Sequence, residues 1–365
     1  MNAPRHTAPM RRALRLAERG RGITSPNPPV GAVVVRGGRV IAEGWHRGPG
    51  SAHAEIEALD AAGESASGAT LYVTLAPCTR EGRTPACLPR VLESGVSHVV
   101  VGTVDPNPDE GDGSVSALRA AGVDVTVGVL EDDARALVGG FSKWITTGHP
   151  LVTLKIAMSL DGRVAAADGS SRWVTGPGAR RDAHRMRSWS GAVVVGVGTV
   201  VADNPQLTCR LRGHAGSQPL RVVLDSTART PLDAAVLDGT APTLIAVSPK
   251  ATDEAVAALR ARGADVLSFP LCDGRVDPAA VLGELGRRQV TDVLVEGGPS
   301  VSGDFAGRGL LDRYVFYLAP KMLGHLGLNA VAGLVVTNIS EARELTITGV
   351  HRVGADIKVE ARPRV

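Results

Sequence analysis

Aromatic residues are scarce in this sequence of 365 residues, where Phe, Trp and Tyr together make up 3%. Proteins that bind single-stranded nucleic acids stack the bases on aromatic side chains, so this scarcity argues against such a function. The formal net charge is only +3, and Lys and Arg do not gather into a basic stripe. The composition therefore predicts that the protein has no nucleic-acid partner.

Long apolar runs are also missing. No stretch of about 18 apolar residues occurs, and the first residues, with Arg11 and Arg12, lack the apolar core of a signal peptide. Only four cysteines are present, and the two outside the motif described below, Cys209 and Cys272, are expected to be free thiols. These features predict a cytoplasmic protein without a membrane partner.

One histidine and two cysteines form a pattern that predicts a catalytic zinc site. His53-Ala-Glu55 precedes Pro77-Cys78 and, further on, Cys87. Three protein ligands leave the fourth tetrahedral position of zinc for water, whose pKa the metal lowers from about 15.7 to roughly 7. Glu55 would carry protons from this water to the ring and the departing amine, as in zinc nucleobase deaminases. The alternatives are ordinary core residues or a structural zinc knuckle with wide spacing.

The surrounding residues predict how Cys78 is presented. Residues 70–75 have the β-branched and aromatic content of a buried strand, and Pro77 is a helix-start signal. Cys78 is therefore expected at a helix N-terminus, where the peptide dipoles favour a thiolate. His53 begins a second helix, whose apolar residues keep helical spacing to residue 62, so its first turn would face the metal.

Strands and helices alternate through the first part of the chain, which predicts a sheet covered by helices on both faces. Gly139-Gly140 and Gly148-His149-Pro150 punctuate the sequence before a new strand-rich pattern begins. We therefore expect a zinc-dependent deaminase domain at residues 1–147 and a second domain at residues 148–365. The elements expected in the first are helices at 10–19, 53–62, 87–94 and 114–121 and strands at 30–35, 40–45, 70–75, 98–103 and 123–127.

Polar residues of the second domain stand beside apolar strands. Lys155 interrupts the apolar run 151–158, and a buried lysine is costly unless it meets an anion or lines a cavity, so it is a candidate site residue. The alternative is a lysine on the open face of an edge strand. Residues 192–201 read as a buried strand, and its G-x-G is weak evidence for a dinucleotide site. Gly298-Pro299 predicts either a phosphate cradle at a helix start or an ordinary turn.

Several motifs in the first domain resemble the deaminase half of the bifunctional riboflavin-biosynthesis enzymes of the RibD family. They are Gly82-Arg83-Thr84-Pro85, Pro26 to Gly31, Gly44-Trp45-His46 and Asp105-Pro106-Asn107-Pro108. The resemblance implies a cytidine-deaminase-like three-layer α/β/α fold and substrate contacts at Asn27 and His46. It also implies zinc ligands at His53, Cys78 and Cys87 and a proton shuttle at Glu55. Ala76 and Arg80 stand where the family usually has Glu and His.

The second domain resembles the reductase half of the same family, which has a dihydrofolate-reductase-like α/β fold and uses NADPH. The matching stretches are Leu154 to Arg163, Thr199 to Arg210, Glu296 to Pro299 and Leu318 to Gly324. By position, the resemblance places Lys155 and Asp203 nearest the reacting carbon. It implies substrate contacts at Ser171, Arg187, Leu207, Arg210 and Glu296, and NADPH contacts at Ala157, Trp173, Thr199, Asp203, Gly298, Pro299, Ser300, Val301, Ser302, Gly303 and Asp304.

The function that the resemblance implies has two steps. Zinc-dependent deamination of 2,5-diamino-6-(5-phosphoribosylamino)pyrimidin-4-one would come first, and NADPH would then reduce the ribosyl group to a ribityl group. Arginines such as Arg187 and Arg210 suit the phosphate of this substrate, since a guanidinium grips phosphate oxygens in pairs. We expect a homo-oligomer, either a dimer or a tetramer. The alternatives are one degenerate half or a different aminopyrimidine, an RNA editor and a purely structural zinc protein.

Overall fold

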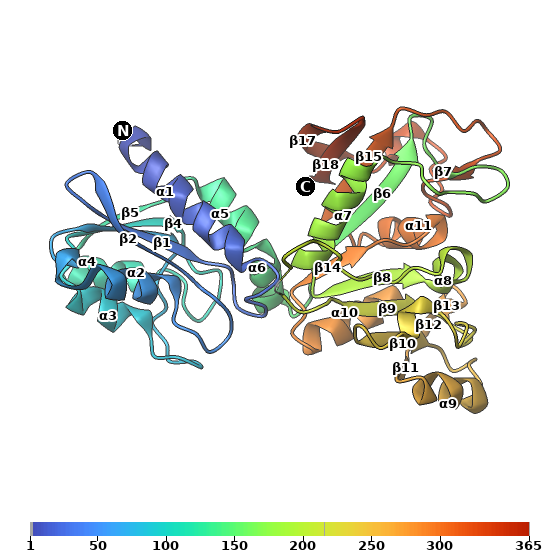
Figure 1. Ribbon diagram of the computed structural model, residues 1–365, viewed down its shortest axis with the longest axis horizontal. Coiled ribbons are helices and arrows are strands. Elements are labelled where there is room, and N and C mark those ends of the chain that lie inside the picture. The colour runs from blue at the N-terminus through green and yellow to red at the C-terminus, as the bar shows by residue number, and fades with distance from the viewer. Residues whose placement is uncertain (1–2, 215, 365) are drawn as a thin grey trace. The chain divides into compact units, whose positions relative to one another are not determined.

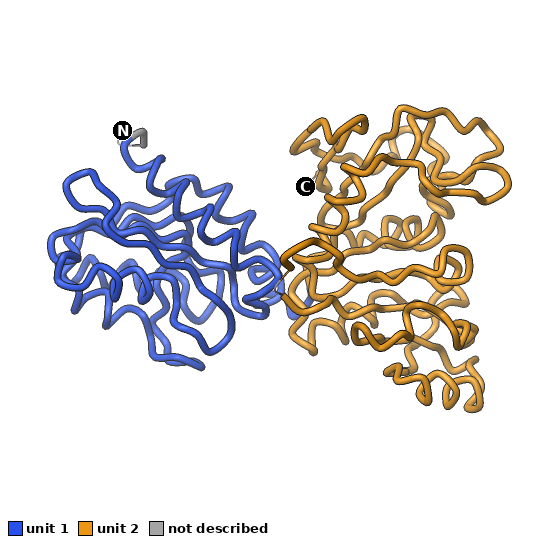
Figure 2. Tube along the Cα trace, viewed as in Figure 1, with its two compact units in different colours: residues 1–149 blue, residues 150–365 orange. Residues whose placement is uncertain are grey.

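The computed structural model describes residues 3–214 and 216–364. Internal contacts divide the chain into two compact units, residues 1–149 and 150–365 (Figure 2). The division falls two residues after the boundary expected from the sequence. Each unit is built on its own β-sheet (Figure 1). No helix among the described residues has the length and apolar character needed to cross a membrane.

A five-stranded sheet forms the centre of the first unit, in the order β2-β1-β3-β4-β5. β1 is antiparallel to both β2 and β3, whereas β3, β4 and β5 run parallel. The central parallel strands β3 and β4 are mostly apolar and buried, as expected of strands that helices cover on both faces. The strands are β1 Gly31–Arg36, β2 Arg39–Trp45, β3 Thr70–Leu75, β4 His98–Thr103 and β5 Asp124–Val127.

Helices lie on both faces of this sheet, as the sequence predicted. One face packs against α2, α3 and α4, and the other packs against α1. The close approach requires glycine: a Cβ at Gly31 would lie 2.1 Å from the Ala13 carbonyl oxygen, and one at Gly44 would lie 2.2 Å from that of Ala54. The helices are α1 Ala3–Ala17, α2 Ala54–Ala62, α3 Cys87–Glu93, α4 Gly113–Ala120, α5 Glu131–Leu137 and α6 Gly139–Thr147.

The second unit contains a nine-stranded sheet in the order β11-β10-β9-β8-β14-β6-β15-β18-β17. The strands from β11 to β15 run parallel, and β18 and β17 add an antiparallel edge. The strands are β6 Leu151–Ser159, β8 Ala192–Gly196, β9 Leu220–Leu224, β10 Thr243–Val247, β11 Asp265–Ser268, β14 Asp292–Val295, β15 Arg313–Ala319, β17 Leu345–Val353 and β18 Asp356–Pro363.

Helices cover both faces of the second sheet as well. One core contains residues of α10 and α11, and the core on the opposite face contains residues of α7, α8 and α9. Two short strand pairs, β7 with β16 and β12 with β13, complete the unit. The elements are α7 Pro177–Trp189, α8 Val197–Asp203, α9 Asp253–Ala261, α10 Pro278–Arg287, α11 Pro299–Gly307, β7 Arg163–Ala165, β12 Leu271–Cys272, β13 Arg275–Val276 and β16 Leu328–Asn329.

The predicted strand over residues 192–201 is wrong in its second half. β8 ends at Gly196, and residues from Val197 onward form α8. Val197 and Val200 are buried on the helix, so this stretch requires apolar residues in a helix just as it would in a strand. A short apolar run cannot by periodicity alone distinguish a buried strand from a buried helix.

Candidate active sites

His53, Cys78 and Cys87 meet beyond the carboxyl end of β3, the central strand of the first sheet. The Nδ1 atom of His53 lies 3.0 Å from the Cys87 sulfur and 3.6 Å from the Cys78 sulfur. Their ligand atoms all lie within 4.8 Å of one another, and no other group of this kind occurs in the described parts of the chain. His53 directly precedes α2, and Cys87 is the first residue of α3.

The expectation that Cys78 begins a helix is wrong. Residues 76–86 form neither helix nor strand, and the backbone N–H groups of Thr79 and Arg80 donate to the side chain of Glu110. The Cys78 sulfur accepts the N–H of Cys87 instead, at 3.4 Å. A helix start therefore does support this thiolate, but the helix is α3 and not one that Cys78 itself begins.

The Cys87 thiol, which keeps its proton, and His53 both favour the thiolate form of Cys78. The hydrogen bond from the Cys87 thiol, together with His53, lowers the pKa of Cys78 to about 4, and the same hydrogen bond raises the pKa of Cys87. A bound cation would displace this proton, because thiolates and not thiols ligate metals. One imidazole nitrogen and two sulfurs are a donor set that suits zinc.

Glu55 lies in the first turn of α2 and is 3% exposed. Its Oε2 atom is buried and makes no hydrogen bond to any described residue. Burial raises the pKa of this carboxyl group, although the neighbouring His53 opposes the rise. A zinc deaminase needs a carboxylate next to the metal to accept a proton from the bound water. The Oε2 atom of Glu55 has no partner and lies beside the three donors, so these residues fit a zinc ion and its water.

Asn27 and His46 lie next to this cluster. The Asn27 amide nitrogen is 3.1 Å from His46 Nε2, and His46 Nδ1 is 3.2 Å from the Ala52 carbonyl oxygen. The His46 ring meets the His53 ring edge-on, with 5.1 Å between centroids. Burial lowers the pKa of His46, and a neutral ring that donates to Ala52 and accepts from Asn27 satisfies both of these contacts.

The second unit brings three predicted polar residues together. The Glu296 carboxylate, just after β14, accepts from Arg187 Nε at 2.6 Å and Nη2 at 3.0 Å, and from Lys155 Nζ at 3.2 Å. Burial alone would raise the pKa of Glu296, but Arg187 and Lys155 outweigh it and hold the pKa well below its usual range. β6 lies between β14 and β15, so Lys155 is not on an edge strand.

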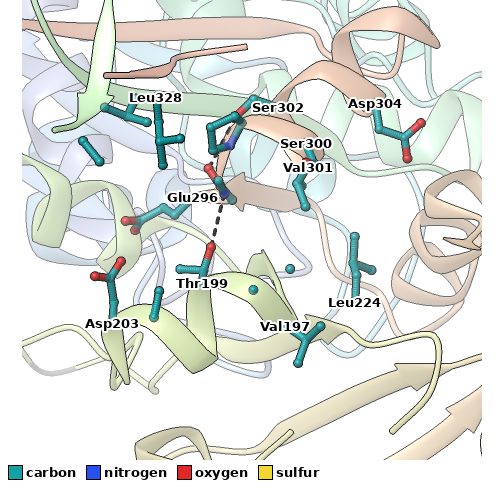
Figure 3. Close-up of a pocket in the computed structure, with 18 of the residues that line it drawn as sticks. Val197, Thr199, Asp203, Leu224, Glu296, Ser300, Val301, Ser302, Asp304 and Leu328 are labelled. Carbon is teal, nitrogen blue, oxygen red and sulfur yellow. Dashed lines mark hydrogen bonds between the residues drawn. The ribbon is translucent and has the colours of Figure 1, made fainter. Parts of the chain in front are cut away.

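A cavity of about 720 Å³ opens beside this group (Figure 3). Glu296 and Asp203 lie on one side of it, and Leu224 and Asp304 lie on the other. Between them, the Gly298 N–H donates to the Thr199 hydroxyl at 3.2 Å, which ties the start of α11 to α8. The predicted site residues that line the cavity are Lys155, Ala157, Ser171, Thr199, Asp203, Glu296, Gly298, Pro299, Ser300, Val301, Ser302 and Asp304.

Five predicted site residues do not line the cavity. Trp173 is 61% exposed, with the Arg180 guanidinium 4.5 Å from its ring centroid. Gly303 faces away, since a Cβ there would lie 1.7 Å from the Ala332 carbonyl oxygen. The other three are Arg187, Leu207 and Arg210.

These three residues have separate surroundings. Arg187 is engaged by Glu296 and by the Thr208 carbonyl oxygen, so its guanidinium positions Glu296. Leu207 is 2% exposed and has a φ of 56°. Arg210 is exposed, and its Nη1 donates to the Gln206 side chain at 2.9 Å. Arg210 is therefore the more accessible of the two arginines proposed for a phosphate.

Sequence reasoning missed two exposed cations that line the cavity. Arg229 lies beyond the C-terminal end of β9, near Ser226 and Thr227, and Arg275 lies in β13. Neither forms an ion pair with any residue that the structure describes. The position of Arg229 after a parallel strand could have been found from the sequence, because such ends bind ligands. The short β12–β13 pair gives no comparable signal.

Comparison with known proteins connects the two units. The zinc-binding region of cytidine and deoxycytidylate deaminases matches residues 4–103, and the RibD C-terminal domain matches residues 150–359. The chain is 41% identical over 354 residues to riboflavin biosynthesis protein RibD of Aquifex aeolicus, covering 96% of each chain. The chain belongs to the RibD family. Its RibD relative from Escherichia coli is 38% identical over 361 residues, with 95% of this chain and 96% of the other covered.

Solved RibD structures agree over the whole length. RibD of Acinetobacter baumannii is 37% identical with a TM-score of 0.88, and all of both chains is covered. The deaminase/reductase of Thermotoga maritima is 36% identical with a TM-score of 0.87 and the same coverage. The chain is thus a bifunctional deaminase and reductase of riboflavin biosynthesis, with a zinc-binding deaminase half and an NADPH-dependent reductase half. The predictions of fold class, function, zinc and NADPH are confirmed.

Proposed function

We propose that His53, Cys78 and Cys87 hold the zinc ion, and that the substrate of this site is 2,5-diamino-6-(5-phosphoribosylamino)pyrimidin-4-one. The Thermotoga maritima relative is named as the deaminase of a diaminohydroxyphosphoribosylaminopyrimidine, which supports this choice. The observation that carries the proposal is the buried, unpartnered Oε2 of Glu55 beside the three donors.

Within this site, the residues of the chain divide the work. Zinc, when bound, activates water for attack on the ring carbon that carries the amino group. Glu55 accepts the proton of that water and passes it to the leaving nitrogen, so that ammonia departs and a carbonyl remains on the ring. Asn27 and His46, side by side next to His53, are suited to hold the pyrimidine edge. The raised pKa of Glu55 favours proton acceptance near neutral pH.

We also propose that the cavity of the second unit holds NADPH, which supplies the hydride that converts the ribosyl group into a ribityl group. The residues fit a dinucleotide: α11 starts at Pro299 behind two glycines, so its first backbone N–H groups can face a pyrophosphate. Lys155, Asp203 and Glu296 then bound the reacting end.

The lining of the cavity also suits an additional phosphate. Arg229 and Arg275 line the cavity together with Ser226 and Thr227. Guanidinium groups grip phosphate oxygens in pairs, and NADPH differs from NADH by one phosphate on the adenosine ribose. We infer that Arg229 and Arg275 select NADPH over NADH.

We further propose that the chain forms a homo-oligomer through the second unit. Ile347 and Val350 on the edge strand β17 are 63% and 60% exposed. An exposed edge strand with apolar side chains is a common site of association between identical subunits. Sedimentation equilibrium would give the mass, and a monomer at micromolar concentration would refute the proposal.

Two assays test the proposed reactions separately. With the phosphoribosyl diaminopyrimidine, the full chain should release ammonia only when zinc is bound. With the deaminated product and NADPH, it should oxidise NADPH whether or not zinc is present. Failure of the first assay alone would reject the zinc site, and failure of the second alone would reject the cavity as the reductase site.

A further inference from the structure

Two loops follow the carboxyl ends of the neighbouring strands β3 and β4 in the first sheet. β3 and β4 are parallel with Leu75 opposite Thr103, and the Ala76 N–H donates to the Thr103 carbonyl oxygen at 3.0 Å. Residues 76–86, which carry Cys78, therefore lie beside residues 104–112. The carboxyl ends of adjacent parallel strands bring these loops together although they are far apart in sequence.

Glu110 of the second loop binds the backbone directly after Cys78. Its Oε2 accepts the Thr79 N–H at 2.8 Å and the Thr79 hydroxyl at 2.6 Å, and its Oε1 accepts the Arg80 N–H at 3.2 Å. No helix or strand supplies partners for these two amides, since residues 76–86 are irregular. A carboxylate that accepts N–H groups makes stronger bonds than a neutral acceptor.

The loop that carries Glu110 is itself held by local hydrogen bonds. Asp105 Oδ1 accepts the Asn107 N–H at 2.8 Å, and Asn107 Oδ1 accepts the Asp109 N–H at 3.1 Å. The Glu110 N–H donates to the Asn107 carbonyl oxygen at 2.9 Å. The Glu110 carboxylate is therefore presented from a preformed turn, and it restrains the more irregular Cys78 loop.

The neighbouring acid of this loop makes a different kind of contact. Asp109 pairs with Arg80 at 3.0 Å, but both side chains are more than half exposed, at 66% and 59%. Ion pairs with this exposure contribute little to the free energy of folding, on the order of 0–1 kcal/mol. Asp109 therefore offers a matched control, because it adjoins Glu110, carries the same charge and does not touch the backbone after Cys78.

We propose that Glu110 is a positioning residue of the zinc site, which fixes the direction of the Cys78 thiolate through Thr79 and Arg80. This inference rests on the zinc ligands proposed above. Glu110 is not itself a ligand, since the donor group in the described chain consists of His53, Cys78 and Cys87. Groups that orient metal ligands typically change metal affinity by about 10–100-fold when removed.

The test measures how fast the zinc-loaded full chain releases zinc to an excess of a chromophoric chelator. Glu110→Ala should release zinc roughly tenfold faster than the parent chain or more. Glu110→Gln keeps one acceptor oxygen and similar volume, so its release rate should lie between the two. Asp109→Ala should match the parent within about twofold. Hydrogen exchange of the β3 amides at the parent rate in each variant shows that the first unit has folded.

A second readout reports the geometry at the sulfurs. In the cobalt-substituted chain, the thiolate-to-cobalt absorption band should change in Glu110→Ala and remain unchanged in Asp109→Ala. The inference is overturned if Glu110→Ala retains the parent release rate and spectrum, or if Asp109→Ala changes them equally. His53→Ala tests the ligand set independently: if it holds zinc as the parent does, the proposed ligands fail, whatever Glu110 does.

Discussion

Arg187 and Glu296 meet at two points, with Nε 2.6 Å from Oε1 and Nη2 3.0 Å from Oε2, across 109 residues of sequence. Their side chains are only 13% and 7% exposed. The pair joins α7 to the end of β14, and Lys155 of β6 shares the same carboxylate. One carboxylate therefore links three elements beside the cavity.

Replacing Glu296 with Ala should destabilise the second unit by about 3–5 kcal/mol, because Arg187 would remain buried without its partner. Hydrogen exchange of the β14 amides measures this loss, and exchange of the β3 amides in the first unit is the internal control. If the β14 amides of the variant exchange at the parent rate, the Arg187–Glu296 pair contributes little to the stability of the second unit.

The contribution of Glu296 should also depend on pH. Its pKa in the folded chain is depressed by Arg187 and Lys155, so its stabilisation is fully present above the ordinary Glu pKa of about 4.3. It is lost as the pH falls from there toward the depressed pKa. The difference in β14 exchange between the parent and Glu296→Gln should thus be constant from pH 7 to pH 5 and shrink below about pH 4. A difference that grows on acidification would contradict this.

Removing both cavity arginines should weaken selection for NADPH. Arg229→Ala with Arg275→Ala should raise the KM for NADPH by about tenfold or more, because charge-assisted bonds to a phosphate are lost, and should change the KM for NADH little. Steady-state rates of NADPH and NADH oxidation give the two KM values. Arg262→Ala, an exposed arginine outside the cavity, is the control. Equal increases for the two cofactors would place the phosphate elsewhere.

Loss of one zinc ligand should separate the two activities. His53→Ala and Cys87→Ser should each lower bound zinc from about one ion per chain toward zero and abolish ammonia release, because two donors hold zinc poorly. NADPH oxidation with the deaminated product should persist. Cys209→Ser, in the second unit, should retain zinc and both activities. Elemental analysis and the two assays decide, and a zinc-replete His53→Ala would refute the ligand set.

The parts that could be predicted from the sequence rest on local patterns. The strand over residues 70–75 was found at its observed limits from its apolar and β-branched content. The zinc trio was found because two thiols and an imidazole near a carboxylate have few other uses together. Lys155 was found because a charge within an apolar run requires a partner, and Glu296 supplies it.

The parts that could not be predicted depend on contacts between distant segments. Cys78 was wrongly placed at a helix start because Pro77 suggested one, whereas Glu110, 31 residues after Thr79, binds the amides there. The mostly apolar sequence of residues 197–201 suits a buried strand or a buried helix equally well. Only the packed structure shows that it is a helix. Gly303 lies between residues that line the cavity, yet its backbone packs on Ala332 and does not face the cavity.

The central claim is that Glu55, buried beside the proposed zinc ligands, carries the proton in deamination. The most direct test is ammonia release by Glu55→Gln with the phosphoribosyl diaminopyrimidine, since this change keeps the shape of the side chain. Ammonia release should fall by roughly 10²–10⁴-fold, while bound zinc and NADPH oxidation with the deaminated product stay at the parent level. Ammonia release at the parent rate would contradict the claim.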